Sequence, residues 1–188
     1  PLPDERALSH ADTLALAALA RAEAGETCNL PLGLKAVAGR AYLYLLTQRD
    51  EPLSPAPAAQ PLPVTVHESA YVLDFTHVTQ TPAGPETPVP SHAGEAVLSP
   101  EVLALGPVMR RPRPGDRIRR MGAPGEKALR RFLTDRRVDP PMRPYLAVLA
   151  VENEVLWIPR LCASERLRLN AVPAGSVRLQ VPSGDPYR

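Results

Sequence analysis

Proline is the residue that most restricts how this chain can fold. The 188 residues include 24 prolines, and residues 51–63 and 79–90 concentrate them. Proline fixes φ and has no backbone N–H, so a stretch of this kind cannot form a helix or a central strand. We therefore predict a proline- and alanine-rich linker at 51–63 and a loop at 79–90. The linker separates residues 1–50 from a second part, 64–183, whose core is expected at about 94–181.

The first part predicts one helix followed by short strands. Ser9 is a good N-cap, and Asp12 lies three residues later, as in a capping box. The Ala- and Leu-rich run at 14–24 ends before Gly25, which is typical of a helix C-terminus. Three short strands are then expected at residues 28–30, 34–35 and 41–46.

The second part predicts a small mixed sheet with a basic helix packed on it. The helix is expected at about 126–136, opened by a glycine turn at 122–125, with one apolar stripe formed by Leu129, Phe132 and Leu133. Strands are expected within 64–78, at 145–151 and 154–158 as a hairpin around Glu152-Asn153, at 166–169 and at 176–181. Trp157 lies among aliphatic residues and is expected in the core. The predicted fold class is α+β.

Basic residues concentrate in one window. Residues 110–143 hold twelve Lys and Arg against four Asp and Glu, whereas the rest of the chain holds ten against sixteen. A concentrated basic face is typical of a protein that binds a polyanion, because cations that neutralise phosphates release counterions. Three alternatives stay open: a solvated charged surface, a general nucleic-acid-binding module, and a docking surface for an acidic protein partner.

The glycine turn ahead of the predicted helix would place free N–H groups beside these cations, a geometry that can hold a phosphate. Asp116 and Asp135 are expected to pair with neighbouring basic residues rather than to act as bases. The cations predicted to contact the polyanion are Arg113, Arg117, Arg119, Arg120, Lys127, Arg130, Arg131 and Arg137.

The sequence shows no catalytic constellation and no metal-ligand spacing. The four histidines are dispersed, and Cys28 and Cys162 belong to no C-x-x-C pair, which favours a reduced, cytoplasmic setting. No apolar run approaches the length of a membrane span, about 20 residues. The chain begins with Pro1 rather than Met, so we expect a piece of a longer protein.

The basic window and the residues after it resemble the C-terminal domain of the tRNA(Ile)-lysidine synthetases. That family's pattern R-x-x-P-G-D-R-x-R-x-x-G-x-x-G-x-K-x-L-x-x-F-x-x-D-x-x-V occurs without a gap at Arg111, Pro114, Gly115, Asp116, Arg117, Arg119, Gly122, Gly125, Lys127, Leu129, Phe132, Asp135 and Val138. Later positions of the pattern correspond to Arg143, Leu156, Trp157, Ile158, Pro159, Glu165 and Arg166. Residues 8–45 look like the end of the family's substrate-binding middle domain. The chain departs from the family at Arg120, Pro124, Arg131, Arg160 and Cys162, where the family usually has Pro, Gly, an acid, Gly and Arg.

The resemblance implies a parent ligase that uses ATP with Mg and L-lysine to convert the wobble cytidine of tRNA(Ile) to lysidine. The segment itself would recognise the tRNA, with the C-terminal domain holding the acceptor end. The family's ATP-binding S-G-G-x-D-S loop does not occur in these residues, so no catalytic residue, cofactor or metal is assigned to the segment. No membrane partner is expected, and a homodimer stays an open alternative. Gly115, Asp116, Gly122, Gly125, Leu129, Phe132, Asp135 and Trp157 are interpreted as structural positions of the motif.

Overall fold

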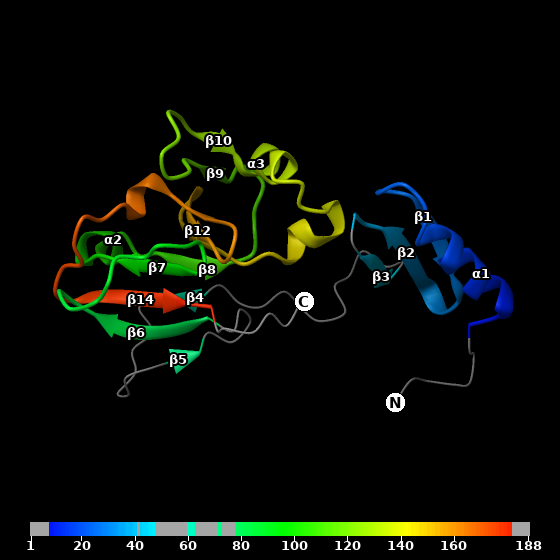
Figure 1. Cartoon of the computed structure of the whole chain (residues 1–188), viewed down its shortest axis with the longest axis horizontal. Coiled ribbons are helices and arrows are strands. Elements are labelled where there is room, and N and C mark those ends of the chain that lie inside the picture. Colours follow the sequence, from blue (N-terminus) through cyan, green and yellow to red (C-terminus); the bar gives the residue numbers. More distant parts are fainter. Residues whose placement is uncertain (1–7, 41, 48–59, 63–70, 73–77, 182–188) are drawn as a thin grey trace. The chain divides into compact units, whose positions relative to one another are not determined.

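The chain divides into two compact units, which are described separately (Figure 1). The computed structural model describes residues 8–40, 42–47, 60–62, 71–72 and 78–181. The first unit comprises Pro1–Ala56 and Arg137–Pro144, and the second comprises Pro57–Arg136 and Tyr145–Arg188. The segment 137–144 therefore belongs to the first unit, whereas the sequence predicts a continuous second part.

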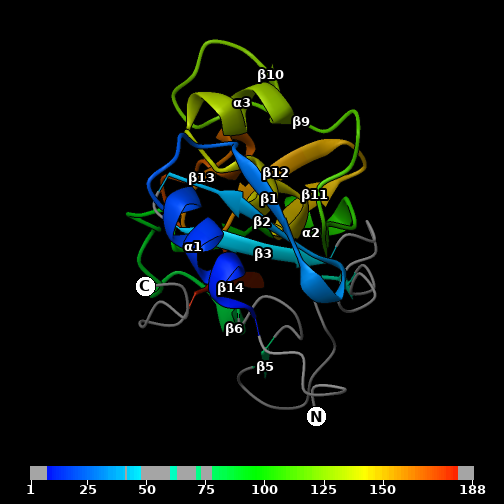
Figure 2. The same cartoon turned by 90° about the vertical axis from the view of Figure 1, so that its right-hand side faces the viewer.

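The first unit is a three-stranded antiparallel sheet with one helix (Figure 2). Its elements are α1 (His10–Leu19), β1 (Thr27–Leu30), β2 (Leu34–Ala38) and β3 (Leu43–Thr47), in the sheet order β1-β2-β3. Leu19 of α1 packs with Leu30, Ala36 and Ala38 in a small core. The predicted helix, its capping box and the three strands are confirmed.

The end of the first helix was predicted wrongly. Helix α1 stops at Leu19, so Gly25 is not its C-terminal glycine. Gly25 instead has a φ of 108° and donates its N–H to the Ala38 carbonyl at 2.8 Å, which fixes the turn into β1. The positive φ explains why glycine occupies this position. The glycine is needed for the turn before the β1–β2 strand pair, not for the end of the helix.

Two sheets enclose the core of the second unit. One sheet has the order β10-β9-β12-β11-β8-β4, with β13 paired to β12, and the other has the order β5-β6-β14-β7. The strands are β4 (Gln60–Pro61), β5 (Tyr71–Val72), β6 (Thr79–Ala83), β7 (Glu95–Leu98), β8 (Val108–Arg110), β9 (Arg117–Ile118), β10 (Lys127–Ala128), β11 (Val148–Val151), β12 (Glu154–Ile158), β13 (Cys162–Ala163) and β14 (Ser176–Gln180). The helices are α2 (Pro100–Ala104) and α3 (Leu129–Asp135), with short 3-10 helices at Pro140–Tyr145 and Glu165–Leu167.

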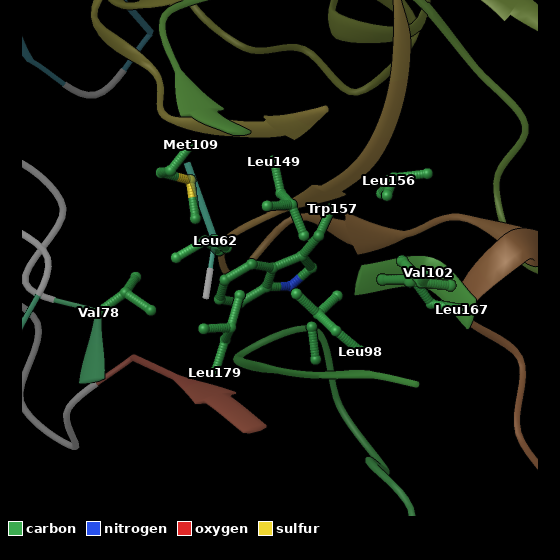
Figure 3. Close-up of a cluster of buried hydrophobic side chains, with 11 residues drawn as sticks. Leu62, Val78, Leu98, Val102, Met109, Leu149, Leu156, Trp157, Leu167 and Leu179 are labelled. Atoms are coloured by element: carbon green, nitrogen blue, oxygen red, sulfur yellow. The ribbon is translucent and has the colours of Figure 1, made fainter. Parts of the chain in front are cut away.

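Trp157 lies at the centre of this core (Figure 3). Its side chain is fully buried with leucines from both sheets, among them Leu98 of β7, Leu149 of β11 and Leu179 of β14. The indole N–H donates to the Ala93 carbonyl at 2.9 Å, so the one polar atom of the ring is satisfied. The α+β class and the 148–158 hairpin are confirmed.

Prolines shape the edges of the second unit rather than exclude strands from it. Gln60–Pro61 form β4 at the edge of the larger sheet, and Leu62 is buried in the core, so these residues are not linker. Residues 51–59 lie outside the described part of the chain. The predicted loop at 79–90 is partly wrong, because Thr79–Ala83 form β6. Within the described residues, β5 pairs with Thr79 and Gln80 of β6 but not with Pro82. Pro82 therefore has a neighbouring strand, β14, on one side only, where a proline can be accommodated.

Two further strand predictions had different outcomes. The predicted strand at 166–169 is wrong: a 3-10 helix spans Glu165–Leu167, and the Ser164 side chain accepts the Arg166 N–H at its start. Of the predicted strands within 64–78, the structure describes only β5 and Val78. No helix among the described residues has the length and apolar character needed to cross a membrane.

Candidate nucleic-acid interface

A proline-glycine turn follows strand β8 in the basic window. Pro114 and Gly115 are its central residues, and the Asp116 N–H donates to the Arg113 carbonyl at 3.2 Å. Gly115 has a φ of 89°, which a type II turn requires at this position and which other residues rarely adopt. The turn therefore explains the P-G-D part of the motif.

A buried ion pair holds this turn to the sheet. Arg110 of β8 donates to both carboxylate oxygens of Asp116, at 2.9 and 2.8 Å, and the two side chains are 5% and 0% exposed. Arg110 also donates to the carbonyls of Arg111 and Glu152, and Asp116 accepts the Arg113 N–H at 2.8 Å. Asp116 thus pairs with an arginine as predicted, whereas the structural role of Arg110 was not predicted. The sequence signal for this role is that Arg110 directly follows the apolar pair Val108-Met109.

The basic helix is shorter than predicted. Lys127 and Ala128 form β10 and pair with Ile118 and Arg117 of β9, so α3 begins only at Leu129. The Leu129 N–H donates to the Asp116 carbonyl at 2.8 Å. The helix therefore does not open at the glycine turn, and the predicted position of its N-terminus beside that turn is wrong. Figure 1 shows β9, β10 and α3 lying together.

The glycine turn is nevertheless a defined structure. The Ala123 N–H donates to the Arg120 carbonyl at 2.9 Å, and Gly122 has a φ of 77°, again as in a type II turn. The Gly122 N–H donates to the Glu165 carboxylate at 2.6 Å, so this donor is already used within the protein. Gly125 has neither a positive φ nor a neighbour that would meet a Cβ atom, so local geometry does not require glycine there.

Ion pairing divides the predicted cations into two classes. Arg117 pairs with Glu126 at 2.7 Å, and Lys127 pairs with Asp135 at 2.7 Å. The remaining cations of β9, α3 and the turns beside them are exposed and form no ion pair with any described residue. These residues, which we call the unpaired arginines, are Arg113, Arg119, Arg120, Arg130, Arg131 and Arg136. Arg137 is exposed, and its backbone has a φ of 57°. It belongs to the first unit.

Arg136 is a member of this group that sequence reasoning missed. Its guanidinium carbon lies 5.6 Å from the centroid of the Phe132 ring, at the end of α3. The pKa of the Cys162 thiol is raised to about 11 by burial, and Arg136 and Arg120 both oppose that increase. The two arginines come from different elements, and both favour the ionised form of the same buried thiol.

Acidic residues at this surface are held in their charged form. The hydrogen bond from Lys127 lowers the pKa of Asp135, and Arg131 lowers it further. The pKa of Glu165 is lowered to about 2, mainly by the hydrogen bonds from Arg168 and then from the Gly122 N–H, with a smaller contribution from Arg119. Both carboxylates remain ionised at neutral pH, and both are bonded to neighbouring donors. No group of three or more His, Cys, Asp or Glu within the described ranges could hold a metal ion.

Comparison with known proteins identifies the segment that carries this surface. Residues 108–179 match the family model described as the TilS substrate C-terminal domain. A solved structure described as the crystal structure of a TilS C-terminal domain is 23% identical, covers 68% of this chain and 91% of its own, and superposes with a TM-score of 0.48. The comparison with curated proteins found no match. All six unpaired arginines lie within residues 108–179, the segment that matches this family model.

Proposed function

We propose that this chain is the tRNA-recognition portion of a tRNA(Ile)-lysidine synthetase, the ligase that converts the wobble cytidine of tRNA(Ile) to lysidine. In this proposal the second unit binds the tRNA, at its acceptor end, and residues 1–50 are the end of the substrate-binding middle domain. ATP activation of the cytidine, with Mg, belongs to a separate catalytic domain that carries the S-G-G-x-D-S loop. The described residues contribute binding rather than a step of the chemistry.

The unpaired arginines are the observation that carries this proposal. Six exposed guanidinium groups lie between residues 113 and 136, inside the matched domain, and no described carboxylate forms an ion pair with them. Arg117 and Lys127, by contrast, are each balanced by a carboxylate, Glu126 and Asp135. An arginine without a carboxylate partner can bind a phosphate without first breaking an ion pair. The surface is therefore best suited to a polyanion.

The kind of contact follows from the side chains that are buried. Trp157 and Phe132 are in the core, so their rings are not available for stacking on bases. Guanidinium groups on a strand pair and a short helix suit contacts to phosphates and to the shape of an A-form helix. Such contacts suit a double-stranded part of the tRNA, such as the acceptor stem.

The test compares two double variants with equal loss of charge. Arg130→Ala with Arg131→Ala removes two unpaired arginines, and Arg117→Ala with Lys127→Ala removes two paired cations from the same surface. Binding of a tRNA(Ile) transcript is measured by fluorescence anisotropy over a salt series. The first variant should reduce the slope of log affinity against log salt by roughly 0.7 to 0.9 for each lost contact, and the second should reduce it less.

The outcome also separates the alternatives. Equal affinity for tRNA, random RNA duplex and DNA duplex at one salt concentration would support a general nucleic-acid-binding module. Binding to an acidic polypeptide such as polyglutamate but not to tRNA would support a docking domain. Unchanged tRNA affinity and salt slope in the Arg130 and Arg131 variant would mean that this surface is only solvated, and the proposal would be wrong.

A further inference from the structure

The Glu165 carboxylate joins two segments that are far apart in the sequence. It accepts the Gly122 N–H at 2.6 Å, and it accepts two bonds from Arg168, from Nε at 2.6 Å and from Nη2 at 3.1 Å. Glu165 is the first residue of the 3-10 helix Glu165–Leu167, and Leu167 of that helix is buried in the core. The carboxylate thus connects the exposed glycine turn to a part of the chain that is fixed by packing.

Backbone hydrogen bonds bring the same two segments together. Arg120 forms an isolated antiparallel bridge with Ser164, which is fully buried. The Glu165 N–H donates to the Arg119 carbonyl at 2.8 Å, and the Met121 N–H donates to the Ala163 carbonyl at 3.0 Å. Arg119 and Arg120 are therefore held along the 163–165 segment, and the Glu165 carboxylate fastens the turn that directly follows them.

We propose that Glu165 is a positioning residue for polyanion binding, which keeps the Arg119 and Arg120 guanidinium groups directed toward phosphates by fixing the Gly122 turn. The inference rests on the proposed function, because it concerns the same basic surface. Contact with the nucleic acid is assigned to the arginines, and Glu165 acts through them.

The sign of one measurement distinguishes this role from simple electrostatics. An acid on a basic surface repels phosphates, so its removal should strengthen polyanion binding if charge alone matters. If Glu165 fixes the turn, its removal should weaken binding even though the surface becomes more positive. The competing idea, that Glu165 occupies an anion site from which phosphate must displace it, predicts tighter binding, as charge alone does.

Glu154 provides a matched control. Its carboxylate also accepts two bonds from an arginine, Arg166, at 2.8 Å each, and its exposure of 32% is close to the 27% of Glu165. It has no hydrogen bond to the backbone of the 119–122 segment among the described contacts. Replacing either glutamate with alanine removes one charge and one arginine pair, and only Glu165→Ala also releases the turn.

The experiment measures tRNA(Ile) transcript binding by the full chain over a salt series, with circular dichroism melting curves for every variant. Glu165→Ala should raise Kd by about 3- to 10-fold near 0.1 M salt. It should also lower the slope of log affinity against log salt by the equivalent of roughly one to two phosphate contacts. Glu165→Gln keeps an oxygen that can accept the Gly122 N–H and should restore the affinity. Glu154→Ala should bind as tightly as the unmodified chain, or more tightly.

A thermodynamic cycle completes the test. In a chain that already carries Arg119→Ala and Arg120→Ala, Glu165→Ala should no longer weaken binding, because the groups that it positions are absent. If Glu165→Ala does not fold, Glu165→Asp replaces it in the experiment. The shorter aspartate side chain keeps the charge but cannot hold the same contacts, so the Glu165→Asp variant should bind the tRNA transcript more weakly. An unmodified chain with no salt-dependent tRNA binding would contradict the proposed function itself. A binding-competent chain whose Glu165→Ala or Glu165→Asp variant binds as tightly or more tightly would overturn only the role of Glu165.

Discussion

The buried pair of Arg110 and Asp116 should be the most sensitive ionic contact of the second unit. Asp116→Ala would leave the Arg110 guanidinium 5% exposed with no counter-charge, although its bonds to the Arg111 and Glu152 carbonyls would remain. Removing one partner of a buried pair typically costs about 3 to 5 kcal/mol, because the other charge stays desolvated. The two remaining carbonyl bonds place the expected cost near 3 kcal/mol.

This cost converts to a measurable change in melting temperature. A domain of this size loses about 3 to 5 °C per kcal/mol, so Tm should fall by roughly 10 to 15 °C in circular dichroism melting at pH 7. The exposed pair Lys127–Asp135 is the control, and Asp135→Ala should change Tm by no more than about 2 °C. A second arm adds Arg110→Met to Asp116→Ala, which removes the unpaired buried charge and should recover at least half of the lost Tm. If Asp116→Ala were no more destabilising than Asp135→Ala, or if the double variant were no more stable than Asp116→Ala, the reasoning would be refuted.

Three further predictions follow from the turns and from Glu165. Gly122→Ala, at a φ of 77°, should destabilise the fold by about 1 kcal/mol in urea unfolding, whereas Gly125→Ala should be neutral; equal effects would contradict the turn assignment. Glu152 has a φ of 50° in the hairpin turn, and Glu152→Asn should raise stability by up to about 1 kcal/mol, because Asn tolerates this region better; lower stability would argue against strain there. The pKa of Glu165 is lowered from 4.5 to about 2, so its contribution to stability is present above pH 4.5 and lost as pH falls toward 2. The melting temperature of Glu165→Gln should therefore fall less steeply than that of the unmodified chain as pH decreases over that interval. Equal slopes in the two proteins would show that Glu165 does not contribute.

Local sequence signals predicted the elements whose stabilising contacts are close in the chain. The Ser9–Asp12 capping box and the 152–153 turn of the hairpin depend on residues only a few positions apart, and both were found. Predictions failed where distant pairing decides the conformation. Lys127 has no local reason to leave a helix, yet it pairs with Ile118 in a strand. Local rules for proline predict a linker at Pro61 and a loop at Pro82, but both residues lie in β-strands where proline can be accommodated.

Arg160 has a backbone conformation that its residue type does not predict. The resembled family usually has glycine where this chain has Arg160, and the structure gives Arg160 a φ of 62°, in the region that favours glycine. The Arg160 N–H donates to the Ala93 carbonyl at 2.8 Å, so a backbone hydrogen bond holds this turn. The positive φ could not be predicted from the arginine itself, because this region of φ favours glycine.

Counting charge along the sequence identified the basic window but not the residues available to a ligand. Of the twelve cations between residues 110 and 143, Arg110 is buried against Asp116, and Arg117 and Lys127 have carboxylate partners at 2.7 Å. These partners are set by strand pairing and by the fold of the turn, so no spacing rule in the sequence distinguishes a paired arginine from an unpaired one. Arg136, which was not predicted as a contact residue, has the same exposed and unpaired character as Arg130 and Arg131. A variant of Arg136 should therefore weaken polyanion binding more than one of Lys127, because a phosphate at Lys127 must compete with Asp135 for the ammonium group.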